Sequence, residues 1–584
     1  MKSTEMRMNC KVMAALVAVV GLAFSAFAAE YIFPNAGGDL ADETAWGGTK
    51  PGDGDFAIVD KAGTYTLSSD VTFGGLRVLA GSSTFNFGNH KMTAPAFGIR
   101  VSAANAANVF YGGTFNLSGT ANCNIAYDAN NVNTIFTNGC IVTNVNTFYA
   151  ARYGVNSKTE IAGGAKVYAK DVNVTYDSGS GNTLDIHDGG QLHLTGNLRS
   201  DGNHSSDGAF GGNSLFVRGV GSQLNVGGDY VAKLGFHRHS NVLRVADGAT
   251  AVLNGGIDMD RPNNRLLIEN GASATIKRIR FSSSGNSVLV SNAMISCSGE
   301  VTGSNSGMSF IYSASASNST FRALGSGSSL TLWGDFFGKS TNGYNTVSLE
   351  GGVVWDGGDR NAMMARTHHS VFRIAGSGTS IGNSSKNFYI GDKDNSATMY
   401  SASNRLEVLD GATLNATRVP VMGIANTLCI SNATLNIGAD SVGLAIGYAT
   451  SGSFSTNCML VLQGATPKIT IAEPSRSACI FYNSSTLRFE IPKEGYAEGY
   501  VPFTMSCQFG FKDRTSRVEI DCEEFVEKTG GKLHLIHAAS LGNDATACLN
   551  ACASTLPEGC SLIIDGGDVY IKSPRKTGFI LMYK

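Results

Sequence analysis

The stretch Asn404-Arg-Leu-Glu-Val-Leu-Asp-Gly-Ala-Thr-Leu414 decides the fold, because it places two short apolar segments on either side of a turn. Leu406 and Val408 are separated by one charged residue, and this period of two puts both side chains on one face of a strand. Gly411 follows and supplies a turn that needs positive φ or a close approach of two backbones. The stretch therefore predicts two short strands that meet at a corner.

The same sequence motif, Asn-x-Leu-x-Val followed by a Gly-containing turn, recurs about every 22 to 34 residues from near residue 108 to near residue 485. This period is typical of solenoids. A unit this small cannot bury its own apolar face, so each unit must stack on its neighbours. A third alternating segment, as in residues 442–447, completes many units. Three strands and three turns predict one coil of a parallel β-helix. Further copies begin at Asn182, Asn213, Asn241, Asn264 and Asn426.

These repeats predict an all-β fold, a parallel β-helix (β-solenoid) of about 15 coils over residues 55–494. Residues 30–54 are expected to form an N-terminal cap and residues 495–584 a C-terminal cap, because open ends would expose unpaired strand edges. Within the C-terminal cap we expect a helix near residues 545–554 and a closing hairpin over residues 561–571. The recurring Asn is expected to adopt the αL conformation and to stack between coils as an amide ladder.

Residues 1–29 are expected to be a cleaved secretory signal peptide; the alternative is an uncleaved N-terminal anchor. Three basic residues precede an apolar run over residues 12–28, which ends in small residues suited to cleavage. No later apolar stretch approaches membrane-spanning length, so we expect no membrane span after cleavage. The formal net charge of −2 gives no attraction to nucleic acid, which argues against that class of partner. The sequence predicts a protein that is secreted or held at a bacterial cell surface.

All but one of the twelve cysteines follow the predicted signal peptide, and an oxidising export route permits disulfides between them. Those within the repeats are expected to be small buried residues. Those near the C-terminus are closer together, and one or two disulfides are expected among them: Cys507, Cys522, Cys548, Cys552 and Cys560.

No metal or cofactor site is predicted from the sequence. No Cys-x-x-Cys pair occurs, which weakens any zinc hypothesis. His237 and His239 share one face of an expected strand, whereas the adjacent His368 and His369 would point to opposite faces. Neither pair is accompanied by acidic residues at a spacing that suits a metal ion.

Two features resemble a known group of bacterial proteins. The segment from Trp46 through Pro51-Gly-Asp-Gly-Asp55 to Leu76 resembles the opening of large bacterial exported β-helix proteins. The later Asn-x-Leu-x-Val units are similar to the passenger-associated repeats of autotransporters. This resemblance implies a right-handed parallel β-helix that is displayed at or released from a bacterial surface, in adhesion or as a scaffold. The chain departs from the family in one respect, since fewer than about a hundred residues follow the last repeat, too few for the usual C-terminal barrel.

The sequence favours an exported, non-enzymatic structural or adhesive protein whose partners are extracellular glycans or other surface proteins. A polysaccharide lyase or glycoside hydrolase is the first alternative, because such sites need several carboxylates, or a carboxylate with a basic residue, on one strand face. The best candidates for that chemistry are Asp258 and Asp260, together with Arg261 and Arg265.

A carbohydrate-binding module is the second alternative, and it rests on two tryptophans. Aligning the segments around Trp333 and Trp355 places the two indoles at matching positions in successive coils. A stacked aromatic pair beside Asp335, Asp356 and Asp359 could bind a sugar ring. The competing interpretation is a stacking ladder inside the rod, and it is the favoured one.

Overall fold

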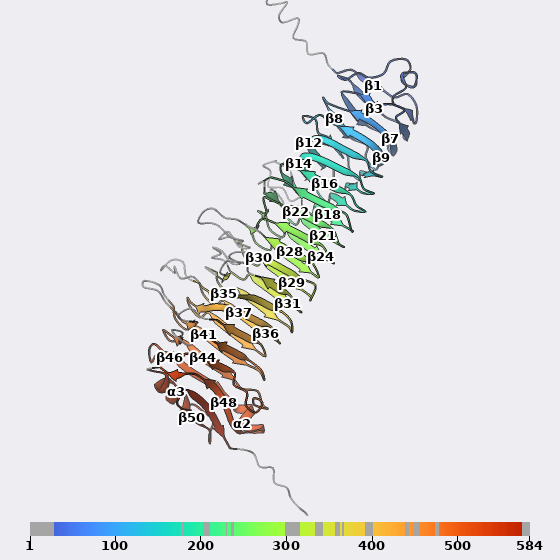
Figure 1. Ribbon diagram of the computed structural model, residues 1–584. Coiled ribbons are helices and arrows are strands. Elements are labelled where there is room, and N and C mark those ends of the chain that lie inside the picture. The colour runs from blue at the N-terminus through green and yellow to red at the C-terminus, as the bar shows by residue number, and fades with distance from the viewer. Residues whose placement is uncertain are drawn as a thin grey trace, which may run out of the picture.

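A computed structural model of the chain is an elongated rod of stacked coils, with β1 (Glu30–Ile32) at one end and β50 (Ser561–Asp565) near the other (Figure 1). The predicted parallel β-helix is confirmed, because the 51 strands of the described residues join one continuous and mostly parallel network. The structure describes residues 28–176, 179–201, 211–228, 231–234, 239–297, 316–332, 343–356, 362–364, 367–391, 401–438, 443–448, 455–472, 478–542 and 544–574. Nearly all of the predicted signal peptide lies outside them, and the right-handed coiling stays a prediction.

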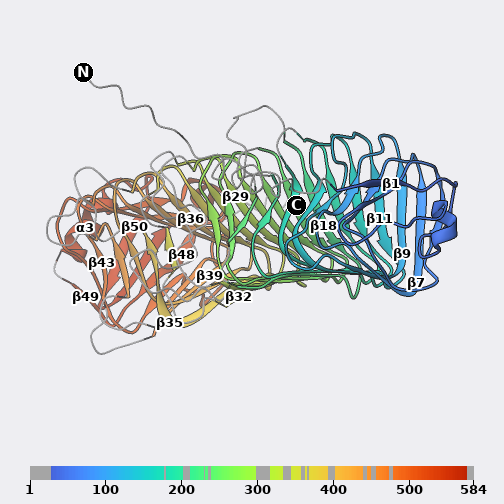
Figure 2. The same cartoon turned by 90° about the horizontal axis from the view of Figure 1, so that it is seen from above.

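Each regular coil contributes one strand to each of three parallel sheets, which we call the first, second and third sheet. In one coil these strands are β15 (Thr183–Ile186), β16 (Gln191–Leu194) and β17 (Leu198–Arg199). They pair in parallel with β18 (Ser214–Arg218), β19 (Gln223–Val226) and β20 (Ala232–Lys233) of the next coil. Strands of successive coils therefore lie side by side along the rod (Figure 2), and equivalent side chains form columns.

The parallel ladder extends past both predicted limits of the β-helix. At the N-terminal end, β1 already pairs in parallel with β3 (Phe56–Val59). At the other end, β44 (Thr486–Glu490) pairs in parallel with β47 (Arg517–Asp521). These outer coils lack the Asn-x-Leu-x-Val motif but keep inward apolar residues. For example, Leu487 of β44 stacks on Val518 of β47. Stacking of coils requires alternating apolar residues but not the Asn-x-Leu-x-Val motif. The predicted limits of the β-helix at residues 55 and 494 were therefore too narrow.

Alternating apolar side chains fill the inside of every described coil. In the β15–β16 coil, Leu184, Ile186 and Leu192 are fully buried, as the period of two predicts. Near the N-terminal end, aromatic rings stack from coil to coil along the first sheet. The Tyr65–Phe85, Phe85–Phe110 and Phe110–Phe136 ring centroids lie 5.4, 4.8 and 5.0 Å apart. The core is one continuous column, because equivalent side chains stack directly on one another.

The recurring Asn forms the expected ladder, but through the backbone. The buried Oδ1 of Asn213 accepts the backbone N–H of Asn182 at 3.1 Å, and Oδ1 of Asn241 accepts that of Asn213 at 3.1 Å. The expected αL conformation was wrong for these Asn residues, because the preceding residue adopts it: Gly212 has φ +75° and Ser240 has φ +61°. The turn is completed one position earlier, which leaves the Asn side chain to satisfy a buried N–H at the corner.

Each end of the rod carries a covering element. At the N-terminal end a short 3₁₀ helix, Glu43–Trp46, places the Trp46 ring 4.9 Å from Phe33 and 5.8 Å from Phe73. At the C-terminal end the helix predicted near residues 545–554 is confirmed as α3 (Ala545–Ala553). The predicted hairpin is confirmed as well, since β50 pairs antiparallel with β51 (Asp568–Ser573).

Strand β51 also pairs antiparallel with β48 (Gly531–His537), which belongs to the last coil. The hairpin therefore covers a strand edge that would otherwise be open. Between β47 and β48 lies the short helix α2 (Glu523–Lys528).

The described cysteines are unpaired. Those within the repeats are buried, which confirms their expected role as small core residues. The disulfides expected among the C-terminal cysteines are not formed in this structure, although the thiols of Cys522 and Cys560 lie in hydrogen-bond contact with each other. Burial raises the pKa of Cys458 and of Cys552 to about 11, so both thiols stay protonated at neutral pH.

Candidate functional site: an arginine–tyrosine face

The predicted tryptophan platform does not form around Trp355. Its side chain in β32 (Val354–Asp356) is only 2% exposed, and it stacks on Phe372 with 6.3 Å between ring centroids. The parallel register pairs Trp355 with Leu330, three residues before the tryptophan with which the sequence alignment had matched it. Trp355 therefore belongs to an internal stack, the interpretation that the sequence favoured, and the sugar-binding alternative fails for this residue. Trp333, Asp335 and Asp359 lie outside the described residues, whereas Asp356 is exposed.

The predicted carboxylate site is divided between two faces of the rod. Asp258 of β23 (Ile257–Met259) and Asp260 lie on one face, and both accept hydrogen bonds of 2.9 Å from Lys233 Nζ. Arg265 instead begins β24 (Arg265–Glu269) on the first sheet, where it pairs with Val242. Arg261 lies in the turn between these strands. The four residues do not share one groove, because a corner of the coil separates the two strands.

The predicted histidine pairs form no metal-ligating group among the described residues. His239 is exposed, and His237 lies outside the described residues. His368 is half-buried, while the exposed His369 stacks on Tyr344 at 5.1 Å between ring centroids. The two adjacent histidines therefore lie in different environments.

The third sheet instead carries a distinctive column of outward side chains in its N-terminal half. Its strands there are β6 (Gly75–Val78), β8 (Gly98–Val101), β10 (Cys123–Asn124), the end of β12 (Ile141–Ala151) and the end of β14 (Lys166–Thr175). The residues before and after each outward position are buried in the core. The parallel register aligns these outward residues in the order Arg77, Arg100, Asn124, Tyr149, Asn173 and Arg199.

Arg152 follows β12 directly and lies at the centre of this column, surrounded by tyrosine rings. Its guanidinium carbon is 5.0 Å from the ring centroid of Tyr149 and 5.1 Å from that of Tyr127. The rings of Tyr153 and Tyr176 lie at 5.3 and 5.7 Å. These distances are those of cation–π contacts. No carboxylate among the described residues pairs with Arg152, so aromatic rings are its main surroundings.

Hydrogen bonding leaves part of the Arg152 guanidinium available. Its Nη1 donates to Asn124 Oδ1 at 2.7 Å, and its Nε is buried without a hydrogen-bond acceptor among the described residues. Arg77 donates to Glu30 at 2.7 Å, and its Nε likewise lacks an acceptor. The Arg152 side chain as a whole is only half-buried and a guanidinium presents five donors, so its Nη groups can still donate to an oxygen-rich ligand.

Arg100 extends the positive charge between these two arginines. Its guanidinium carbon lies 4.1 Å from the Tyr127 ring centroid. Burial lowers the pKa of Arg100, and the charges of Arg77 and Arg152 lower it further, against the opposing effects of Tyr127 and Asp128. The guanidinium still carries its charge at neutral pH. Glu30 already pairs with Arg77, so the charges of Arg100 and Arg152 are the ones that a further anionic partner would stabilise.

We call this surface the arginine–tyrosine face; it comprises Arg77, Arg100, Asn124, Tyr127, Tyr149, Arg152, Tyr153 and Tyr176. Local structure explains the tyrosines: Tyr127 and Tyr176 each follow a third-sheet strand, and each donates its backbone N–H to the preceding coil. Their rings are half-buried, so they cover the corner while one part stays accessible. Aromatic faces stack on sugar rings, and arginine forks bind carboxylates with two hydrogen bonds.

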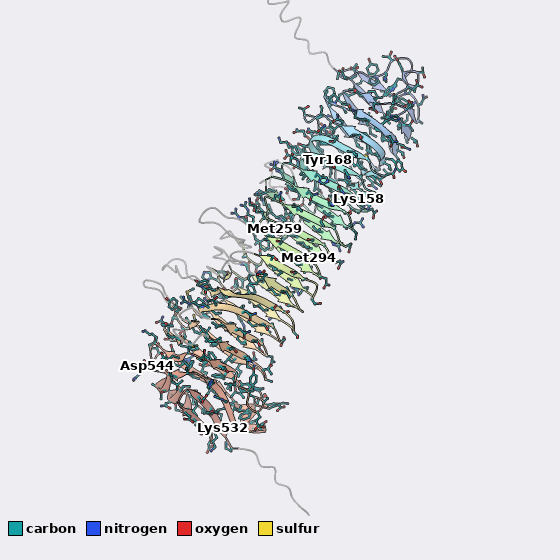
Figure 3. All side chains as sticks on the ribbon, in the orientation of Figure 1. Lys158, Tyr168, Met259, Met294, Lys532 and Asp544 are labelled. Atoms are coloured by element: carbon teal, nitrogen blue, oxygen red, sulfur yellow. The ribbon has the colours of Figure 1, made fainter. Side chains whose placement is uncertain are left out.

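A second polar group, the carboxylate cluster, lies on the first sheet and comprises Lys158, Glu160, Asp185, His187 and Arg218. Figure 3 labels Lys158 in the N-terminal half of the rod. Arg218 donates to both oxygens of Asp185, at 3.0 and 2.8 Å. Lys158 Nζ lies 2.9 Å from Glu160 and 3.2 Å from Asp185. His187 Nε2 lies 2.9 Å from the same Glu160 oxygen.

The carboxylates of this cluster are held in their charged form. Burial raises the pKa of Asp185, but hydrogen bonds from Arg218 and Lys158 outweigh it, and the net pKa lies below its ordinary value. Hydrogen bonds from Lys158 and His187 likewise outweigh burial at Glu160, so the net pKa of this carboxyl is also lowered. A general acid requires a raised pKa instead. The cluster is thus suited to ion pairing more than to proton donation.

Sequence reasoning missed the arginine–tyrosine face because its members are separated by whole coils. Arg100, Tyr127, Arg152 and Tyr176 recur at intervals near the coil period, and that spacing was the available signal. Only the register shows that they form one surface. Tryptophans and paired aspartates are stronger markers of a site when a sequence is considered one residue at a time.

No family model matches the sequence, and neither a curated protein nor a solved structure matches it significantly. Among the described residues, no helix has both the length and the apolar character needed to cross a membrane. The function must therefore be argued from the surface itself.

Proposed function

We propose that the protein is an exported, non-enzymatic β-solenoid that acts as a structural or adhesive protein at a bacterial surface or outside the cell. We further propose that it binds acidic polysaccharide through the arginine–tyrosine face. The observation that carries this proposal is Arg152, which lies among four tyrosine rings without a carboxylate partner among the described residues.

The chemistry of the face favours a polymer that has both rings and carboxylates. Tyrosine faces suit the apolar side of a sugar ring, and arginine suits a uronic carboxylate. Coils repeat at about 4.8 Å, so a polymer lying along the rod meets similar groups in successive coils. The predicted signal peptide and the resemblance to autotransporter passenger repeats support the extracellular setting.

A polysaccharide-active enzyme is the alternative proposal. The carboxylate cluster favours it, because Glu160 and Asp185 stand on adjacent strands of the first sheet with basic residues beside them. Against it stand the lowered pKa values of both carboxyls, so neither of them is a proton donor at neutral pH.

The experiment compares polygalacturonic acid with neutral dextran in isothermal titration calorimetry against the mature chain. We expect binding of polygalacturonic acid alone and a loss of about 10- to 100-fold in affinity for Arg152→Ala, the range for hydrogen bonds to a charged group. Arg322→Ala is the matched control, because that arginine is half-exposed on the first sheet. Equal affinities of the two variants would refute the proposed face.

The same samples test the enzyme alternative through the chain length of the recovered polymer. We expect the length to stay unchanged after prolonged incubation. Shortening of the polymer that disappears in Glu160→Gln would establish the alternative instead.

A further inference from the structure

Three potential metal ligands meet where the closing hairpin joins the last coil. They are His534 and His537 of β48 and Asp568, the first residue of β51. Figure 3 labels Lys532, on the same strand, near the C-terminal end of the rod. The carboxylate cluster also brings a histidine and two carboxylates together, but Lys158 and Arg218 already occupy its oxygens. In the C-terminal group, by contrast, no Lys or Arg of the described residues forms an ion pair with the carboxylate.

A β-bulge is the reason that both histidines face the same side. Residues three apart in a regular strand point to opposite faces. Between His534 and Ile536 the pairing register with β51 shifts, and Leu535 and Ile536 are both fully buried. The extra residue turns His537 back to the face of His534. The register then places His537 directly opposite Asp568.

The side chains already converge on one oxygen. His537 Nδ1 lies 2.7 Å and His534 Nε2 lies 2.9 Å from Asp568 Oδ1. His534 Nε2 also lies 2.9 Å from the backbone carbonyl oxygen of Ile536. The His534 ring stacks on Tyr570 with 4.2 Å between ring centroids, which fixes its orientation. The group is thus held by packing on one side and by the bulge on the other.

We propose that His534, His537 and Asp568 bind a divalent transition metal, with Zn²⁺ as the expected ion. Two imidazole nitrogens and one carboxylate oxygen form a common zinc ligand set, completed by a water or a fourth ligand. Zinc bonds of about 2.0–2.1 Å with tetrahedral angles separate ligand atoms by about 3.3 Å, so the present atoms must move apart by about half an ångström.

A metal at this place would join two chain segments that are distant in sequence. His534 and His537 belong to the last coil, whereas Asp568 belongs to the hairpin that covers its edge. The ion would therefore fasten the C-terminal closure to the rod. Binding to the folded chain raises the free energy of unfolding of whatever region forms the site.

The test is a titration of the metal-free mature chain with ZnCl₂ in calorimetry, together with hydrogen exchange of the β48–β51 segment. We expect one site with a dissociation constant below about 10 μM, a free energy of roughly −7 kcal/mol or better. The His534→Ala/His537→Ala double variant should weaken Zn²⁺ binding by at least about 30-fold. Loss of a group that only supports a metal ligand already weakens metal affinity by about 10- to 100-fold. Zn²⁺ should slow exchange in the wild type only.

Two variants keep the test interpretable. Asp568→Asn retains an oxygen that can accept the histidine hydrogen bonds but loses the negative charge, so a folded chain with weakened zinc binding is expected. His90→Ala removes a histidine from the opposite end of the chain and should bind like the wild type. Absence of binding at 100 μM ZnCl₂, or equal affinity in the double variant, would overturn the proposal.

Discussion

The Asn ladder offers the sharpest test of how the coils are held together, and Asn182→Ala is the variant that removes one step. Asn182 is fully buried. Its Oδ1 accepts the backbone N–H of Ser157 at 2.9 Å, and its Nδ2 donates to the Gly154 carbonyl oxygen at 2.8 Å and to Thr175 at 3.1 Å. The alanine variant therefore leaves one N–H and one C=O buried without these partners.

The expected cost follows from those two groups. Each buried polar group that loses its partner costs about 1–3 kcal/mol, so Asn182→Ala should lower the local free energy of opening by about 2–6 kcal/mol. Asn182→Ser is the matched variant, because serine already accepts the equivalent bond elsewhere, as where Ser157 Oγ accepts the N–H of Val132. It should cost less than the alanine variant, since it keeps an acceptor for Ser157.

Hydrogen exchange measured by mass spectrometry is the suitable assay, because solenoids do not open as one unit. The peptide that contains Ser157 should lose protection by a factor of about 30 or more, at about 1.4 kcal/mol for each tenfold change. Peptides several coils away should be unaffected. Two results would refute the reasoning: a loss below about 1 kcal/mol in the alanine variant, or equal losses in the alanine and serine variants.

Three further predictions follow from the described contacts. Trp355→Ala should lower the free energy of unfolding by about 3–5 kcal/mol and leave polygalacturonate binding unchanged, measured by thermal unfolding and calorimetry; loss of binding alone would contradict its place in the core. The pKa of Asp185 is lowered, so its contribution to stability is present above about pH 4 and is lost as pH falls through the folded-state pKa; a flatter profile of Tm against pH between 6 and 2 in Asp185→Asn would confirm this, and an unchanged profile would not. Cys123 and Cys297 should resist alkylation in the native state, because burial raises the pKa of both thiols; rapid labelling by iodoacetamide without denaturant would be inconsistent with their burial.

The sequence was sufficient for the architecture because stacking imposes the same demands on every coil. Alternation predicted which residues face inward, and Leu184 and Leu192 are buried as expected. The position of the αL residue was wrong by one, because Asn and its predecessor both tolerate turns and the repeat alone does not distinguish them. Coils without the Asn-x-Leu-x-Val motif were missed at both ends of the rod, because its Asn is only one way to supply an acceptor for the buried backbone N–H at the corner.

The candidate site was much less predictable. A surface on a β-helix is made of residues one coil apart, so Arg100 and Arg152 meet only when the length of each loop between them is known. Trp355 was a misleading marker, because its large apolar ring suits the core as well as a sugar. The histidines of β48 come together through a bulge, and the alternation rule places them on opposite faces.

The most direct test of the proposed function is a hydrogen-exchange footprint of the mature chain with and without an oligogalacturonate. The proposal predicts slower exchange in peptides that contain Asn124, Tyr149 and Arg152, with no change along the first sheet near Asp185. Slower exchange around the carboxylate cluster instead, with none at the arginine–tyrosine face, would contradict it.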